Sequence, residues 1–208
     1  MKKNLKDYVI KQQKFLDKEF CNETISQLKE SENNWQQHTF YNSKTGEAKA
    51  WSGNQELDVL HDTNIKNTND LNKKLWFGLD TYIKHVNLPW HSGWAGYSSV
   101  RYNRYSQNRK MAEHCDHIHS LFEGKRKGIP ILSCLGVLND DYEGGEFVMF
   151  EDFEIKLEQG DLLIFPSNFS LEFTTTELEY SSLPKNSSLF CNLFSNNTKD
   201  FLFKSFLR

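Results

Sequence analysis

The N-terminal part of the chain contains two stretches in which apolar residues recur at helical spacing. The first runs from Leu16 to Leu28 behind Asp17, an acidic residue suited to cap the start of a helix. The second begins after Asn69 or Asp70 and ends at Asn87, and its apolar stripe consists of Leu71, Leu75, Leu79, Ile83 and Val86. The pattern therefore predicts two amphipathic helices.

Beyond residue 90 the pattern changes to short runs rich in β-branched and aromatic residues, separated by Gly, Pro and Asn-Asp. Such runs are typical of antiparallel β structure. We predict eight strands, which are Tyr97–Tyr105, Lys110–His117, Ile129–Leu138, Glu146–Glu151, Phe153–Leu157, Asp161–Pro166, Ser170–Thr176 and Ser187–Phe194. This many short strands indicate a sandwich or jelly roll, with the helices packed on one outer face.

Length and charge restrict the class of protein. The 208 residues suit a single domain over 1–208, with a helical and irregular flank at 1–90 and a β core at 91–200. A net charge of −3 and an isoelectric point near 6.2 give no reason to expect nucleic acid as a partner. The sequence shows no signal-peptide pattern and no apolar run long enough for a membrane span, so we expect a cytoplasmic protein without a membrane partner.

A histidine and an aspartate two residues apart, His114 and Asp116, are the strongest candidates for chemistry. In a β-strand, residues i and i+2 project from the same face, so the imidazole and the carboxylate can converge on one ion while Cys115 points away. The spacing predicts half of a metal site. If the chain turns after Asp116, His117 or His119 could join Cys115 in a zinc site of mixed ligands.

Further motifs surround this pair in a fixed order. They are Arg101-Tyr102, His114-Cys115-Asp116, residues 137–141, residues 142–146 with their Gly-Gly-Glu turn, and residues 160–168 from Gly-Asp to Phe-Pro-Ser-Asn. In this order and with these gaps they resemble the prolyl 4-hydroxylase branch of the iron(II)- and 2-oxoglutarate-dependent dioxygenases. The resemblance implies an α+β, mainly β fold: a double-stranded β-helix (a jelly roll, cupin-like) with N-terminal helices packed on its major sheet.

The resemblance also implies a chemistry. In that family two histidines and a carboxylate hold iron(II), and 2-oxoglutarate serves as the cosubstrate. It follows by resemblance that His114 and Asp116 are two of the metal ligands and that Tyr102 lines the cosubstrate pocket. The implied activity is that of an oxidoreductase that hydroxylates an amino-acid side chain in a small molecule, peptide or protein and releases succinate and CO2.

Two positions of the family pattern lack the expected residue type. The chain has no histidine after His119, and near the expected second histidine the candidate ligand is Glu172. The arginine expected to bind the distal carboxylate of 2-oxoglutarate is also missing from residues 181–194, where Lys185 is the only cation. Lysine can bind a carboxylate as a point charge, without the bidentate geometry of arginine. The alternative interpretation of both residues is an ordinary surface position.

Three functions therefore compete at the level of sequence. The first is an active iron(II)- and 2-oxoglutarate-dependent hydroxylase. The second is a degenerate β-helix shell that has lost these two residues together and serves as a binding or assembly module. The third, which we rank last, is a metal enzyme independent of 2-oxoglutarate that uses His114, Asp116 and a nearby histidine.

Overall fold

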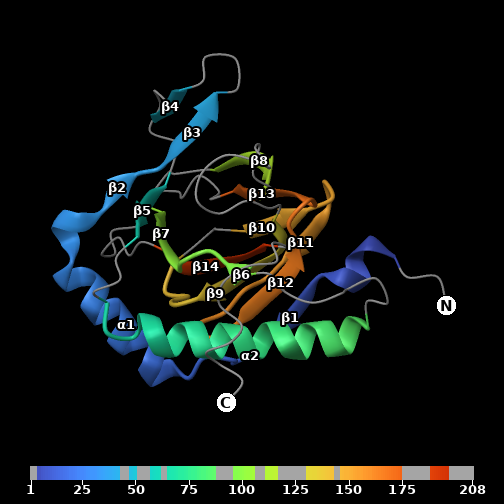
Figure 1. The fold of residues 1–208 in the computed structure, drawn as a ribbon, viewed down its shortest axis with the longest axis horizontal. Helices are drawn as coiled ribbons and strands as arrows, with labels where there is room; N and C mark the ends of the chain where they lie inside the picture. Colours follow the sequence, from blue (N-terminus) through green and yellow to red (C-terminus); the bar gives the residue numbers. More distant parts are fainter. Residues whose placement is uncertain are drawn as a thin grey trace.

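The computed structural model describes residues 4–42, 47–50, 57–61, 65–87, 96–105, 111–116, 130–142, 146–174 and 188–196. For several strand residues, including those of the strands at 111–115 and 170–174, it describes the backbone alone. Within these ranges two α-helices lie along one side of a large antiparallel sheet, and a smaller sheet lies on the other side (Figure 1). No helix in the described ranges is long and apolar enough to cross a membrane.

The helices form where the apolar stripes predict them. Helix α1 spans Lys18–Glu30, and the Asp17 carboxylate caps it by accepting a hydrogen bond of 2.8 Å from the backbone N–H of Phe20. Helix α2 spans Thr68–Val86 and ends at Asn87, whose φ of 48° is left-handed. Short 3-10 helices occur at Leu5–Tyr8 and Glu32–Asn34.

The predicted start of α2 at Asn69 or Asp70 was wrong. Asn67 precedes the first helical residue, and no side-chain hydrogen bond caps the helix there. The Asn67 amide instead donates a 2.9 Å hydrogen bond to Oγ1 of Thr24, and its backbone N–H donates to Gln27 at 3.1 Å. The start of α2 is therefore set by its attachment to α1, which local sequence does not reveal.

The large sheet has the order β1-β12-β9-β14-β7-β5-β2, with β6 pairing alongside β14, and all its pairings are antiparallel. The strands are β1 (Ile10–Gln12), β2 (Gln36–Gln37), β5 (Asp58–Leu60), β6 (Gly96–Tyr97), β7 (Arg101–Tyr105), β9 (Pro130–Val137), β12 (Leu162–Pro166) and β14 (Ser188–Asn196).

The smaller sheet has the order β11-β10-β13-β8 and is also antiparallel. Its strands are β8 (Met111–Cys115), β10 (Glu146–Met149), β11 (Phe153–Ile155) and β13 (Ser170–Thr174). A separate hairpin joins β3 (Thr39–Asn42) to β4 (Glu47–Ala50). Two antiparallel sheets arranged in this way form the expected jelly roll.

The large sheet separates two hydrophobic cores. The outer core packs the helices against one face of the sheet and includes Leu71 and Leu75 of α2 with Cys134 of β9. The inner core lies between the two sheets and includes Leu135 of β9 with Phe147 of β10. Because side chains alternate along a strand, neighbouring residues of one strand belong to different cores. Membership in a core therefore tells which way a strand residue faces.

All eight predicted strand regions contain strands, with shifted ends. The run predicted from Tyr97 to Tyr105 is divided into β6 and β7, because residues 98–100 leave the ladder. The flank at 1–90 supplies β1, β2 and β5 to the large sheet, so the expected division at residue 90 does not separate the two parts of the fold. These added strands are two or three residues long, too short to show a period of two.

Candidate active site

Strand β7 presents Tyr102 to the outer core. The side chain is fully buried, and its hydroxyl lies 2.8 Å from Oγ1 of Thr68 at the start of α2. The sequence resemblance implied that Tyr102 lines a cosubstrate pocket. Its hydroxyl is instead on the helix side of the large sheet and bonds to a helix residue, so this position indicates a structural role.

The opposite face of β7 carries Arg101, Asn103 and Tyr105. Tyr105 is buried in the inner core. In the strand register, Arg101 pairs with Asn192 of β14, which in turn pairs with Leu135 in the inner core. Directly paired residues share a face of the sheet, so Arg101 lies on the inner side. Asn103 is only 2% exposed, and its Oδ1 atom has no hydrogen-bond partner in the described part of the chain.

The positive charge of Arg101 interacts with several nearby polar and ionisable residues. Burial lowers the pKa of the Arg101 guanidinium, while the negative charges of Tyr105 and Asp116 act in the opposite direction. One of its terminal nitrogens, Nη1, lies 3.4 Å from Nε2 of His38. Burial lowers the pKa of His61, and the positive charge of Arg101 lowers it further. Arg101 therefore lies within electrostatic reach of a predicted metal ligand.

The predicted ligand pair lies at the end of β8. His114 is the fourth residue of this strand, and its backbone pairs with Leu171 of β13. Asp116 follows the strand directly and is partly exposed. The side chain of His114 lies outside the described part of the structure, as do His117 and His119 entirely. Coordination by these histidines therefore stays a prediction.

The strand register tells which face of the small sheet carries position 172, where Glu172 is the candidate third ligand. Leu171 and Phe173 pair with Met149 and Phe147 of β10, both of which are buried in the inner core. Glu172 pairs instead with Val148, a position on the opposite face of β10. Position 172 therefore belongs to the side of the small sheet that faces away from the inner core.

The other predicted contacts cannot be placed. Lys185, the candidate for binding 2-oxoglutarate, lies outside the described residues. Among the described side chains, no group of three or more His, Cys, Asp or Glu is arranged to hold a metal ion. The donor types at the end of β8 nevertheless fit iron(II), since an imidazole and a carboxylate at positions i and i+2 are ligands this metal accepts.

Sequence reasoning missed the inner-face residues of β7. An Arg-Tyr pair occurs twice, as Arg101-Tyr102 and as Arg104-Tyr105, and a spacing of three places equivalent residues on opposite faces of a strand. The sequence shows that side chains alternate between the two faces of this strand, but it does not tell which face meets the inner core. The contact of His38 with Arg101 depends on pairing between distant strands.

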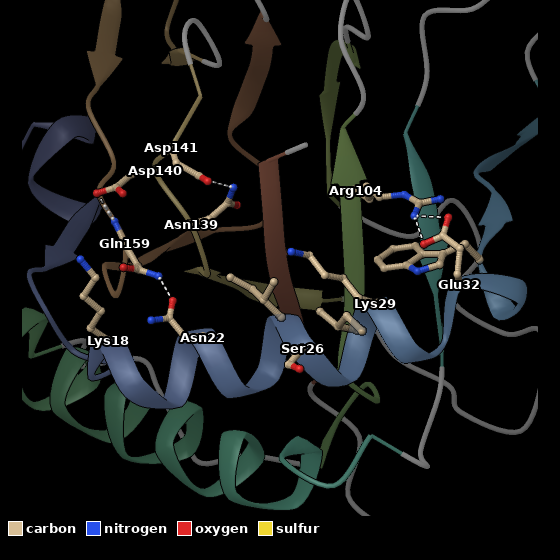
Figure 2. Close-up of a pocket in the computed structure, with 13 residues that line it drawn as sticks. Lys18, Asn22, Ser26, Lys29, Glu32, Arg104, Asn139, Asp140, Asp141 and Gln159 are labelled. Atoms are coloured by element: carbon tan, nitrogen blue, oxygen red, sulfur yellow. Dashed lines mark hydrogen bonds and ion pairs between the residues drawn. The ribbon is translucent and has the colours of Figure 1, made fainter. Parts of the chain in front are cut away.

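A groove of about 660 Å³ lies on the opposite side of the sheet, between α1 and the turns that follow β9 and β11 (Figure 2). At one end, Nη1 of Arg104 lies 2.7 Å from both carboxylate oxygens of Glu32, and its guanidinium is 4.5 Å from the ring centroid of Trp35. At the other end, Nε2 of Gln159 donates a 2.9 Å hydrogen bond to Asn22. These contacts join α1 and the residues after it to the sheet, and the groove is separate from the His114–Asp116 pair.

A family model and curated relatives match part of the chain. Residues 100–182 match the model of the 2OG-Fe(II) oxygenase superfamily. A PKHD-type hydroxylase of Xylella fastidiosa (strain M12) is 34% identical over 84 residues, which cover 32% of this chain and 34% of the relative. The chain thus matches about a third of the length of the curated relatives.

Solved structures share the fold. A prolyl hydroxylase of Trichoplax adhaerens, in complex with a fragment of a hypoxia inducible factor, has a TM-score of 0.63 at 15% identity, covering 91% of this chain and 84% of its own. The viral collagen prolyl hydroxylase of Paramecium Bursaria Chlorella virus-1, in a 2OG complex, has a TM-score of 0.58 at 14% identity, covering 92% and 97%.

The expected cofactors, iron(II) and 2-oxoglutarate, are those of the matched superfamily. The two ligand positions at the end of β8 fall inside the matched residues, and the same match supports the expected class of oxidoreductase. Residues 100–182 therefore carry the pattern of the 2OG-Fe(II) oxygenase superfamily.

Proposed function

We propose that this protein is an iron(II)- and 2-oxoglutarate-dependent dioxygenase that hydroxylates an amino-acid side chain in a peptide, a protein or a small molecule. His114 and Asp116 supply two of the metal ligands. The observation that carries the proposal is the match of residues 100–182 to the 2OG-Fe(II) oxygenase superfamily, which includes His114 in β8 and Asp116 directly after this strand. An imidazole and a carboxylate are ligands that iron(II) accepts.

The proposed reaction consumes 2-oxoglutarate and O2. One oxygen atom enters succinate as CO2 leaves, and the other is inserted into a C–H bond of the substrate. The oxidation of 2-oxoglutarate supplies two of the four electrons that reduce O2, and the substrate supplies the other two. The chain itself has to hold the metal at the end of β8, orient the cosubstrate and exclude water. The inner core beside this end, with Tyr105 and Leu135, provides an apolar wall for that purpose.

A peptide is the substrate class with the most support. The Trichoplax relative in fold was solved with a peptide fragment, and the Xylella relative in sequence is named as a PKHD-type hydroxylase. We extend the substrate class, and not a particular peptide, to this chain.

One observation favours the alternative, a shell that no longer oxidises a substrate. The inner positions of β13 nearest to β8 are Leu171 and Phe173, neither of which can bind iron. If β13 supplies no ligand, the site has the pair on β8 and whatever the undescribed residues contribute. Metal binding and succinate formation together separate the two functions, because the shell needs neither.

The experiment is a metal titration of protein prepared without oxygen, followed by calorimetry with iron(II) or manganese(II). We expect one metal per chain, lost in His114→Ala and in Asp116→Ala, and kept in Glu172→Gln as the matched control. Addition of 2-oxoglutarate with the metal should raise the melting temperature, because a ligand at a hundred times its Kd adds about 2.7 kcal/mol.

Two results would decide against the dioxygenase. Wild-type protein that binds no metal would exclude it. Protein that binds metal and 2-oxoglutarate but forms no succinate with any of a broad library of peptides and amino acids would favour the shell. A loss of metal binding in Glu172→Gln would show that position 172 is a ligand.

A further inference from the structure

Strand β13, the neighbour of β8, has apolar residues at its inner positions from Phe169 to Phe173. Phe169 directly precedes the strand and packs against the inner core. Leu171 and Phe173 follow at steps of two, and both pair with inner-core residues of β10. The polar residues Ser170 and Glu172 fall at the alternate positions. Over this stretch β13 therefore offers the inner side only residue types that cannot bind a metal.

The strand register identifies which of these positions lies opposite His114. The backbone of His114 pairs with that of Leu171, and Cys115 pairs with Ser170. Directly paired residues of two antiparallel strands share a face of the sheet, with Cβ atoms about 4.5–5.5 Å apart. Position 114 therefore lies on the inner face opposite position 171. Asp116 follows β8 at the end where β13 begins.

An extra residue in β8 accounts for the inner position of His114. Phe173 pairs with Met111, so a step of two residues on β13 corresponds to a step of three on β8. In a regular strand, positions 111 and 114 would lie on opposite faces. The shift in register brings both of them opposite inner positions of β13, and such bulges often redirect a side chain next to a functional site. The backbone thus brings position 114 to the side where its direct neighbour on β13 is a leucine.

The ligand set at this place lacks a donor from β13. Non-haem iron(II) sites commonly use two imidazoles and one carboxylate from the protein. Facing positions on adjacent strands are close enough for two imidazoles to bind one ion, but a leucine side chain has no lone pair to donate. Glu172 does not substitute for it, because position 172 lies on the other face of the small sheet. Position 171 is therefore the place from which β13 would complete the set.

We propose that the metal of this protein is held without a ligand from β13, and that an external donor from solution fills the coordination position next to Leu171. The external ligand is a monodentate nitrogen or oxygen donor, and it is water when no other is present. The inference rests on the proposed function, because it concerns the metal held by His114 and Asp116. Each ligand on the same chain binds at a high effective concentration, so a site with one ligand fewer holds its metal less tightly.

The first test adds the absent imidazole to the chain. Leu171→His places it opposite His114, and Phe173→His is the matched control on the same strand and face, opposite Met111. Titration of anaerobic protein with cobalt(II), followed by the visible absorption of the bound metal, gives each dissociation constant. We expect Leu171→His to bind at least about tenfold more tightly than wild type, because even residues that only support a metal ligand contribute 10- to 100-fold. Phe173→His should not tighten binding, because its position is about 7 Å further along β13.

The second test supplies the imidazole from solution and does not depend on the folding of Leu171→His. Leu171→Ala makes room for a free imidazole, and Phe173→Ala is the matched control. Imidazole that binds elsewhere on the metal affects both variants equally, so the difference between them reports on position 171. We expect added imidazole to increase the cobalt(II) affinity of Leu171→Ala several-fold more than that of Phe173→Ala. Circular dichroism verifies that each variant is folded.

The outcomes separate the inference from the proposed function. If wild type binds metal and neither Leu171→His nor imidazole with Leu171→Ala increases the affinity, another residue fills this coordination position; the inference is overturned and the proposed function stands. Equal gains in Leu171→His and Phe173→His would also overturn the inference. If wild type binds no metal but Leu171→His does, the assignment of position 171 stands and the proposed function is overturned. If none of these proteins binds metal, both are overturned.

Discussion

The hydroxyl of Tyr102 lies 2.8 Å from Oγ1 of Thr68, and this contact joins the centre of the large sheet to the first turn of α2. Tyr102 is fully buried and Thr68 is 7% exposed. A hydrogen bond between two buried hydroxyls keeps both satisfied in the outer core. The contact therefore explains why a tyrosine can occupy a position that is otherwise surrounded by apolar side chains.

Loss of either hydroxyl should cost stability without affecting the cosubstrate. We expect Tyr102→Phe and Thr68→Val each to lower the free energy of unfolding by about 1–3 kcal/mol, because each removes the hydrogen bond between these two buried hydroxyls. The double variant should lose less than the sum of the two. Urea unfolding measures these values. Tyr102→Phe with unchanged stability and weakened 2-oxoglutarate binding would instead restore the cosubstrate role implied by the resemblance.

The strands of the jelly roll were predictable because their sequence is β-branched and aromatic and their turns contain Gly or Asn-Asp. β9 and β12 show this pattern clearly, and both form where we predict them. The edge strand β2 consists of Gln36 and Gln37, both exposed, and carries no such signal. Its pairing with β5 depends on the position of the large sheet and not on its own residues.

The candidate site was predictable only in part. The spacing of His114 and Asp116 defines a ligand pair on any extended strand. The choice between Tyr102 and Tyr105 required knowledge of which face of β7 meets the helices, because a tyrosine is suited to either side. The electrostatic interaction of Arg101 with Asp116 connects β7 to the residue after β8, in a different sheet, and periodicity within one strand contains no information about such a connection.

Gly160 should not tolerate a side chain. Its φ is 89°, and a Cβ atom there would lie 2.2 Å from the backbone carbonyl oxygen of Leu16. Gly160 also accepts a 2.8 Å hydrogen bond from the N–H of Leu16, so the two backbones cannot separate without losing it. We expect Gly160→Ala to lower the free energy of unfolding by about 2 kcal/mol or more.

Gly78 in α2 provides the matched control. A Cβ atom at this position would meet the ends of the Leu162 and Phe15 side chains, which can rotate away. Alanine also favours a helix over glycine by about 1 kcal/mol, which offsets part of the crowding. Chemical denaturation of both variants should therefore show a much smaller loss for Gly78→Ala. Equal losses would contradict the role of the Leu16 contact.

The cap of α1 should respond to acid. The hydrogen bond from the backbone N–H of Phe20 holds the pKa of Asp17 below its ordinary value of 3.8, and Lys74 contributes in the same direction. A lowered folded-state pKa stabilises the protein above the unfolded value, and this contribution is lost as the pH falls through the folded value. Asp17→Ala should cost about 1 kcal/mol at neutral pH.

Asp17→Asn separates the cap from its charge. Asparagine can accept the same hydrogen bond, so this variant should keep most of the stability at pH 7. It carries no titrating group, so its free energy of unfolding should fall less than that of wild type between pH 5 and the acid limit. Thermal unfolding at several pH values measures the difference, and identical acid profiles of Asp17→Asn and wild type would contradict the assignment.

The thiol of Cys21 should be inert in the native protein. Burial, together with the negative charge of Asp17, raises its pKa to about 12, and the side chain is completely inaccessible. At pH 8 only about one thiol in ten thousand would be ionised, and the thiolate is the reactive form. Alkylation followed by peptide mapping should modify Cys21 only at the rate of unfolding, and at the ordinary rate in urea.

Because the raised pKa of Cys21 belongs to the folded state, the free energy of unfolding should also fall as the pH rises above 9.0, the ordinary value for this thiol. Cys21→Ala removes this alkaline loss, and a variant that kept it unchanged would assign the loss to another group.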